Sequence, residues 1–384
     1  MRKTAIVGCG MTKFGRRTEG LIDLMTEACH QALRDSNTLH EDFQALFVGN
    51  MACNEFEGIQ GPANALCSRL GLEPAFASRL ENTTASGASA ALAGWLAVAS
   101  GTCNLALVAG GERMTTVPTQ SATDIIARML PPHEYTQGFT LPSMAGLLAR
   151  RYMLTYNASR EALAQVAVKN HHNASLNPDA HLQNLITVED VLKSPSIADP
   201  LRLYDFCPIS DGAAAIVLAP LEEAAKFTDA PVLISGIGAA NDTHAVQERK
   251  DFLTLEAVRV ASDAAYRMAG REPREIDVAE THDMATILEI VESEDLGFFE
   301  KGEGLNAEEA GTTALKGELP LNTSGGLKAR GHPLGATGVA QIVEVVHQLQ
   351  RRCGRRQVEA DVGLACNMAG FGHSAIVSIM ERAS

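Results

Sequence analysis

Short runs of aliphatic and β-branched residues alternate along the chain with longer stretches whose apolar residues recur at helical spacing. Apolar runs of about 4–8 residues between turn residues are typical of buried strands, and longer periodic stretches are typical of helices. The strands predicted on this basis cover residues 4–7, 45–48, 105–108, 214–218, 232–234, 277–280, 362–365 and 374–379. The predicted helices cover residues 21–36, 86–99, 141–153, 160–173, 254–270 and 338–351. This alternation indicates an α/β fold.

The two halves of the chain repeat one order of elements. The sequence AIVGCG at residues 5–10 and the sequence LISGIG at residues 233–238 are each followed by a helix, a strand and a loop containing Met-Ala. A Gly- and Ala-rich helix and another strand complete each half. Such a duplication predicts two related sheets around shared helices, although any two βαβ stretches share some likeness. Residues 116–205 have no counterpart, so the predicted parts are a first half (1–115 with 206–225), an inserted cap (116–205) and a second half (226–384).

Charge and cysteine content exclude several classes of function. The formal net charge of −14 over 384 residues argues against binding to nucleic acid or to an anionic membrane surface. No run approaches the roughly 18 apolar residues of a membrane span, and the start of the chain lacks the pattern of a signal peptide. The eight cysteines form no CxxC pair, so we expect reduced thiols in a cytoplasmic protein, with neither disulfides nor a zinc site.

The most informative segment is NTSGGLKARGHPLGATG at residues 322–338, which contains five glycines and is followed by a long apolar helix. Glycines allow the backbone to approach a ligand closely. His332 stands directly before Pro333, which places an imidazole on a rigid turn at the start of that helix. The pattern favours either a catalytic acid or base, or an oxyanion donor. A structural histidine that caps the helix is the alternative.

Three further segments carry candidate groups. Cys366 follows the end of a predicted strand in GLACNMAGFG, and His282 follows another strand in ETHDMA. Reactive groups gather at strand ends in α/β folds, but a cysteine or histidine there can also simply pack. Thr84 stands just before the Ala-rich helix in ENTTASGASA. A helix N-terminus favours developing negative charge, so this is a good place for a nucleophile, and the hydroxyl residues there are equally suited to helix capping.

In this order, the segments xxASGxSA, THDM, GGxxARGHPxGATG and CNxxGFG resemble the thiolase superfamily over nearly the whole chain. The runs AQVAVKNHHN, ADPLR and CPISDGAAA are similar to the branch that contains sterol carrier protein 2 and the archaeal acetyl-CoA acetyltransferases. The resemblance implies a duplicated, five-layered α-β-α-β-α fold with two mixed sheets.

The resemblance also implies roles for single residues. Thr84 occupies the position of the cysteine that takes the acyl group from acyl-coenzyme A (acyl-CoA). His332 matches the histidine that activates this nucleophile, and Cys366 matches the second cysteine, which moves the α-proton of the acceptor thioester. His282 matches the histidine that helps to hold the thioester oxygen. A threonine hydroxyl is a poor replacement for a thiolate, which is both a good nucleophile and a good leaving group.

Coenzyme A enters as a substrate in this scheme, and no permanently bound cofactor or metal is expected. The run from Ser324 through Gly325 to Gly326 matches the part of the family that approaches the pantetheine arm. Cys53 and Cys207 are the other thiols near the expected site, and we interpret both as bystanders because neither stands at a helix N-terminus. The acyl pocket is expected within residues 121–148, with four apolar candidates: Met129, Phe139, Met144 and Leu147.

Three functions stay open from the sequence. The first is a thiolase-like acyltransferase that makes or cleaves a C–C bond beside a CoA thioester, by 3-ketoacyl-CoA thiolysis or Claisen-type condensation. The second is a retro-aldolase for β-hydroxyacyl-CoA, which needs a base but no acyl-enzyme. The third is a non-catalytic subunit that binds CoA esters or scaffolds a partner. The resemblance further implies a homodimer and a small zinc-ribbon/OB-fold partner protein.

Overall fold

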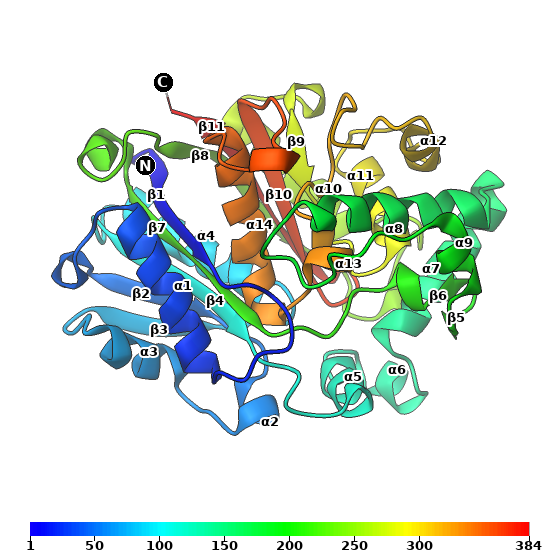
Figure 1. The fold of residues 1–384 in the computed structure, drawn as a ribbon, viewed down its shortest axis with the longest axis horizontal. Coiled ribbons are helices and arrows are strands. Elements are labelled where there is room, and N and C mark those ends of the chain that lie inside the picture. Colours follow the sequence, from blue (N-terminus) through cyan, green and yellow to red (C-terminus); the bar gives the residue numbers. More distant parts are fainter. Residues whose placement is uncertain (384) are drawn as a thin grey trace.

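The computed structural model describes residues 1–383, and one mixed sheet of nine strands runs through it in the order β3-β2-β4-β7-β1-β8-β11-β10-β9 (Figure 1). The strands of this sheet are β1 (Thr4–Met11), β2 (Ala45–Gly49), β3 (Phe76–Leu80), β4 (Ala106–Glu112), β7 (Gly212–Pro220), β8 (Val232–Asn241), β9 (Val278–Glu280), β10 (Val362–Ala369) and β11 (Ser374–Arg382). All eight strands expected from the sequence are confirmed, and β3 is an addition.

The helices cover both faces of the sheet and the space enclosed by its two halves. They are α1 (Leu21–Asp35), α2 (Cys53–Glu57), α3 (Pro62–Leu70), α4 (Ser86–Ala99), α5 (Thr119–Ala127), α6 (Pro132–Thr136), α7 (Leu141–Tyr156), α8 (Arg160–Ser175), α9 (Val188–Lys193), α10 (Glu256–Ala269), α11 (Thr286–Asp295), α12 (Gly304–Glu309), α13 (Gly326–Arg330) and α14 (Leu334–Leu349). The six helices expected from the sequence are confirmed, although α14 begins four residues earlier than predicted.

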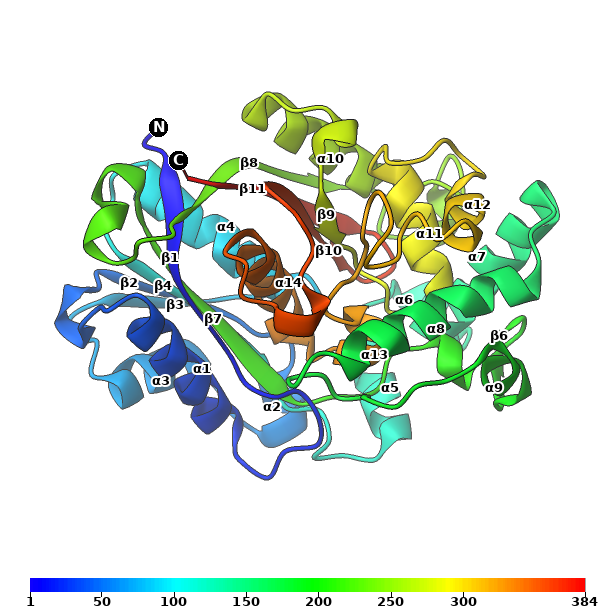
Figure 2. The same ribbon diagram turned by 45° about the horizontal axis from the view of Figure 1, so that its top comes forward.

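Three apolar clusters define five layers. Helices α1 and α3 pack on the outer face of the first half of the sheet, and α10 and α11 pack on the outer face of the second half. Between the two halves lie α4 and α14 (Figure 2), and their Trp95 and Val343 belong to one apolar cluster that includes strand residues of both halves. The α-β-α-β-α layering and the internal duplication are therefore present.

The two halves of the sheet are joined rather than separate. Strand β1 pairs with β8 in antiparallel fashion over three residue pairs, which link residues 4–6 to residues 232–234. On their other sides, β1 pairs with β7 and β8 pairs with β11. The expectation of two separate sheets is thus corrected in one respect: a short hydrogen-bonded seam makes them one continuous sheet that folds around α4 and α14.

Residues 116–205, the segment that we call the cap, lie beside the second half of the molecule (Figure 1). The cap contains α5 to α9 and a small hairpin of β5 (Ser196–Ala198) and β6 (Leu201–Arg202). Leu148 and Tyr152 of α7 share one apolar cluster with Leu255 and Val258 near the start of α10. In residues 1–383, no helix is long and apolar enough to cross a bilayer.

Candidate active site

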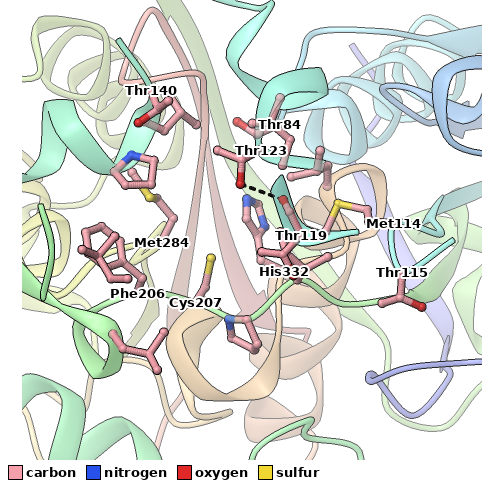
Figure 3. A pocket seen from close by; sticks show the side chains of 18 of the residues that line it. Thr84, Met114, Thr115, Thr119, Thr123, Thr140, Phe206, Cys207, Met284 and His332 are labelled. Carbon is pink, nitrogen blue, oxygen red and sulfur yellow. Dashed lines mark hydrogen bonds between the residues drawn. The ribbon is translucent and has the colours of Figure 1, made fainter. Parts of the chain in front are cut away.

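A cavity of about 640 Å³ opens between the cap and the ends of the central helices (Figure 3). Its walls come from α5, the start of α7 and the segment from Leu203 to Ile209. Thr84, His282 and His332 line its buried end and are each no more than 5% exposed. The structure therefore brings together three of the four catalytic candidates, which the chain carries at widely separated positions.

The Thr84 hydroxyl is fully engaged with the backbone. It donates to the carbonyl oxygen of Met368 at 2.7 Å and accepts the N–H of Gly370 at 3.1 Å. The preceding Thr83 has φ +45°, in the left-handed region, so the chain turns sharply into α4. Because a hydroxyl has a single proton, Thr84 has none to give to a neighbouring base. Its geometry is that of a structural link between the turn before α4 and the end of β10.

His332 is held with one ring nitrogen toward its own helix. Nδ1 lies 2.7 Å from the Thr337 hydroxyl oxygen, and that hydroxyl donates its proton to the carbonyl of Pro333 at 2.9 Å. Nδ1 must therefore be the donor to Thr337. The tautomer assigned from this network leaves the Nε2 lone pair of His332 unprotonated. On a ring that lines the cavity, this nitrogen is a base.

His282 carries the opposite tautomer. Its Nδ1 accepts the backbone N–H of Met368 at 3.3 Å and lies 2.8 Å from Nδ2 of Asn367. A backbone N–H can only donate, so Nδ1 has no proton and Nε2 is the N–H of this ring. Nε2 is buried and has no hydrogen-bond partner among residues 1–383. A buried donor without a partner costs about 1–3 kcal/mol, which marks it as a candidate to bind a ligand oxygen.

The two rings form a complementary pair. Their centroids lie 5.0 Å apart and their planes are nearly perpendicular, at 89°. Burial lowers the pKa of His282 to about 3, with a smaller contribution from the charge of Arg330. Burial also lowers the pKa of His332 well below its ordinary value, and His282 and Arg330 add to this effect. Both rings are thus neutral at neutral pH, one presenting a proton and the other a lone pair.

Backbone contacts between α4 and α14 fix the distance between the residues that precede these helices. A Cβ atom placed on Gly87 would lie 2.6 Å from the carbonyl oxygen of Gly335. A Cβ atom on Gly338 would lie 2.4 Å from the amide nitrogen of Ala88. The carboxylate of Glu112 accepts the N–H of Gly335 at 3.1 Å and anchors the start of α14. Only glycine allows so close an approach.

Cys366 lies elsewhere, which corrects the role expected for it. It is 0% exposed and is not part of the cavity wall. Burial and the nearby carboxylate of Glu292 raise the pKa of its thiol well above the ordinary value. Successive side chains of a strand point to opposite faces, and in β10 it is Asn367 that faces His282. The thiol of Cys366 therefore points toward α11, on the other face of the sheet.

The glycine-rich run expected at the pantetheine arm is also placed away from the cavity wall. The Ser324 hydroxyl donates to the buried carboxylate of Glu280 at 2.5 Å. Gly325 and Gly326 have φ of +102° and +60°, and a Cβ on Gly326 would lie 2.2 Å from Oδ2 of Asp283. These glycines let α13 begin against Asp283. Their conformation thus has a structural cause within the described residues.

Two wall residues were not predicted to act. Cys207 is half-buried and lines the cavity. Cys53 begins α2, contrary to the expectation that it stands at no helix N-terminus, but it is 1% exposed, lies outside the wall and directs its sulfur to the carbonyl of Ile59 at 3.3 Å. Arg16 is an exposed cation on the wall. In the sequence, Cys207 could be placed only in the loop before β7, directly before Pro208. That position did not show in which direction the thiol points.

Part of the segment expected to form the acyl pocket lines the cavity, but with other side chains than those expected. Ile126, Thr140 and Leu141 line the cavity, whereas the four apolar candidates do not: Met129, Phe139, Met144 and Leu147. Met144 of α7 is buried in an apolar cluster, against which Met129 and Phe139 pack from the segments between helices, and Leu147 of α7 is exposed. No group of three or more His, Cys, Asp or Glu side chains in residues 1–383 is arranged to hold a metal ion.

Comparison with known proteins agrees with this architecture. Residues 4–222 match the family "Thiolase, N-terminal domain", and residues 238–382 match "Thiolase C-terminal domain-like". The chain is 44% identical to acetyl-CoA acetyltransferase of Methanothermobacter thermautotrophicus, with 100% of both chains covered. It is 29% identical to human sterol carrier protein 2, with 99% of this chain and 72% of that protein covered.

A solved structure of the Ltp2-ChsH2(DUF35) aldolase is similar with a TM-score of 0.87 and 25% sequence identity, and 99% of this chain and 98% of the other are covered. Relatives and structure agree with the branch indicated by the motifs. Two family matches that together span nearly the whole sequence, and a relative aligned from end to end, show that this chain belongs to the thiolase family of enzymes.

Proposed function

We propose that this protein is a thiolase-like acyltransferase that makes or cleaves the C–C bond beside a CoA thioester. The observation that carries the proposal is the pair of neutral histidines with opposite tautomers at the buried end of one cavity. Cleavage of such a bond leaves an enolate, which needs a hydrogen-bond donor at its oxygen and a base for the incoming group. His282 Nε2–H is suited to the first task and His332 Nε2 to the second.

In the thiolysis direction, the thiol of free CoA gives its proton to His332 Nε2, and its sulfur attacks the β-carbonyl of a 3-ketoacyl-CoA. The bond between the α- and β-carbons then breaks, and its electron pair forms the enolate of the shortened thioester. His282 Nε2–H stabilises the enolate oxygen. Since the Thr84 proton is donated to Met368, we propose direct transfer of the acyl group to CoA without an acyl-enzyme at Thr84.

A retro-aldol reaction is the second candidate, and the engaged hydroxyl of Thr84 favours it. A β-hydroxyacyl-CoA would give its hydroxyl proton to His332 Nε2, and the same bond would break to release an aldehyde or ketone and the same enolate. This reaction forms no acyl-enzyme, so it does not require a cysteine in place of Thr84. The similar structure of the Ltp2-ChsH2(DUF35) aldolase supports it further.

An assay of both substrate classes tests the proposal. The purified protein is incubated with 3-ketoacyl-CoA plus CoA, and separately with 3-hydroxyacyl-CoA, and the thioester products are separated by chromatography. Turnover of the keto compound supports the acyltransferase, and release of a carbonyl product from the hydroxy compound alone supports the aldolase. Binding of CoA esters without turnover of either class would support the non-catalytic subunit instead and would contradict our proposal.

Arg16 is expected to bind the phosphates of CoA at the exposed side of the cavity. It lines the wall in a protein with a formal net charge of −14, so an anionic substrate depends on a local cation. We expect Arg16→Ala to raise KM for the CoA thioester about tenfold, which corresponds to about 1.4 kcal/mol, with kcat little changed.

The matched control for Arg16 is the N-acetylcysteamine thioester, which has no phosphates, measured with both forms of the enzyme. The substitution should leave its kcat/KM unaltered. Equal loss with both thioesters would show that Arg16 acts on the fold of the site rather than on phosphate.

We further propose that the protein is a homodimer joined through β3. This strand lies at the end of the sheet order, so one of its sides is unpaired, and Phe76 on it is 63% exposed. Exposed edges with apolar side chains are sites of strand pairing between chains. Phe76→Asp should shift the mass measured by light scattering from dimer to monomer, and Leu154→Asp on α7, which replaces another exposed residue (77%), should not. A wild-type monomer would contradict the proposal.

A small zinc-ribbon/OB-fold partner is proposed on the family resemblance and on the name ChsH2(DUF35) in the similar aldolase structure. Co-expression with candidate proteins of that class, followed by gel filtration, tests whether a stable complex forms.

A further inference from the structure

We propose that Cys207 is the thiol that carries a proton on and off the α-carbon of the CoA thioester. The inference rests on the proposed function, since it assigns a further catalytic residue to the same site. The family resemblance gives this role to Cys366, whose thiol lies on the other face of the sheet. Cys207 is the one cysteine in residues 1–383 that lines the cavity.

The backbone fixes Cys207 beside the loop that bears His282. The N–H of Cys207 donates to the carbonyl of Met284 at 3.0 Å, and the neighbouring Phe206 forms an isolated β-bridge with Ala285. Two consecutive residues are thus paired with the segment just after His282. Figure 3 shows the Cys207 sulfur pointing into the cavity that His332 also lines.

A buried ammonium group accompanies this thiol. Lys328 is 1% exposed, and its charge opposes the effect by which burial raises the pKa of Cys207 to about 12. Its Nζ lies 3.2 Å from Nε2 of His171, whose Nδ1 donates to the carbonyl of Asn184 at 2.8 Å. Burial lowers the pKa of Lys328 to about 8, and the negative charges of Cys207, Asp283 and Asp205 favour its protonated form. The ammonium can therefore balance a thiolate at Cys207 after the thiol has lost its proton.

A second observation points to a ligand at the same place. The Nε2–H of His282 is buried, has no partner in the described residues, and belongs to a ring on the cavity wall. A thioester oxygen that accepts this N–H places the adjoining α-carbon within the cavity that the Cys207 thiol enters. An oxygen donor and a proton carrier are the two groups that interconversion of a thioester and its enolate requires.

With this assignment, every proton that moves in the cleavage direction has a donor and an acceptor. When the α,β-bond breaks, its electron pair forms the enolate, and Cys207 Sγ–H gives its proton to the α-carbon. The positive charge of Lys328 favours the thiolate that is left. His332, which took a proton from CoA or from the β-hydroxyl, returns that proton to Cys207, so both groups end as they began. In condensation each transfer runs in reverse.

The test is hydrogen exchange at the α-carbon, a partial reaction that does not need C–C cleavage. Acetyl-CoA is incubated with enzyme in deuterium oxide, and the mass of its acetyl group is followed. We expect exchange by the wild type and a loss of about 100-fold or more in Cys207→Ala, with the dissociation constant for acetyl-CoA within about threefold of wild type. Cys53→Ala, a cysteine off the wall, is the matched control and should exchange at the wild-type rate.

Cys366→Ser tests the competing assignment. Retained exchange in Cys207→Ala, or its loss in Cys366→Ser alone, overturns the inference. A wild-type enzyme that cleaves a CoA thioester but incorporates no deuterium at the α-carbon overturns it as well, and leaves the proposed function intact. Neither exchange nor cleavage with any CoA thioester would mean that the proposed function itself fails. A misfolded variant would also lose exchange. The Cys207→Ala variant must therefore unfold at the wild-type temperature and bind the CoA ester as the wild type does. Cys207→Ser is a second, nearly isosteric variant for the same test.

Discussion

Replacing His332 by alanine is expected to lower kcat/KM about 10³-fold, whichever of the two C–C reactions the enzyme performs. The variant loses the Nε2 lone pair that accepts the proton of the incoming thiol or of the β-hydroxyl, and general-base catalysis typically contributes about 10²–10⁴-fold. Steady-state kinetics with the substrate identified in the two-class assay provide the measurement. Retention of more than about a tenth of the activity would contradict the assignment of His332 as the base.

The pH profile gives an independent check on the same residue. Burial holds the pKa of His332 well below its ordinary value, so the imidazole stays neutral and able to accept a proton as the pH falls through about 6.5. We expect kcat/KM to stay nearly constant between about pH 6 and pH 8 and to fall only at lower pH. A rate that halves near about pH 6.5 would show a solvated histidine and contradict the burial argument.

His282→Ala is the second large effect, with an expected loss of about 10²–10³-fold in kcat and little change in KM. Removal of one donor to a developing oxyanion has this size in other enzymes, because the interaction is stronger in the transition state than with the bound substrate. Parallel measurement of kcat and of the dissociation constant separates the two effects. A large rise in KM at constant kcat would show that His282 only binds the ground state.

The tautomer of His282 is tested through its neighbour. Asn367 presents Nδ2 to Nδ1 of His282 at 2.8 Å. In Asn367→Asp the new carboxylate attracts a proton to Nδ1, which leaves Nε2 without its N–H, so we expect a loss of activity comparable to that of His282→Ala. Asn367→Ala is the control: the backbone N–H of Met368 still points at Nδ1, and the loss should be smaller. Equal losses in both variants would contradict the tautomer argument.

The sequence predicted the long periodic elements and missed those whose pattern depends on tertiary context. Strand β3 has only five residues and lies at the edge, so its alternation is weak. All ten residues of α11 are buried, including Glu289 and Glu292. The acidic residues in this stretch would instead predict a helix with one face exposed to solvent. Its acidic side chains are held inside by partners distant in sequence, such as Lys169. No local pattern contains that information.

In the candidate site, too, some features could be predicted from the sequence and others could not. The motifs, through their resemblance to the thiolase superfamily, predicted that Thr84, His282 and His332 would lie together, and all three line one cavity. They were not sufficient to choose between the two faces of β10, which decides whether Cys366 or Asn367 points at the histidines. Nor did they show that Cys207 points into the cavity, because that depends on the pairing of its loop with Met284.

The glycine contacts between α4 and α14 have a consequence for how such an enzyme can diversify. Where main chain touches main chain, as at Gly87 and Gly335, no substitution can widen or tilt the platform beneath the reacting carbon without separating the two helices. New substrates must therefore be accommodated by changes in the cavity-lining side chains of α5 and of the start of α7. The reacting groups are thus held by the closely packed helices α4 and α14, and substrate selectivity depends on side chains of α5 and α7 that can be replaced.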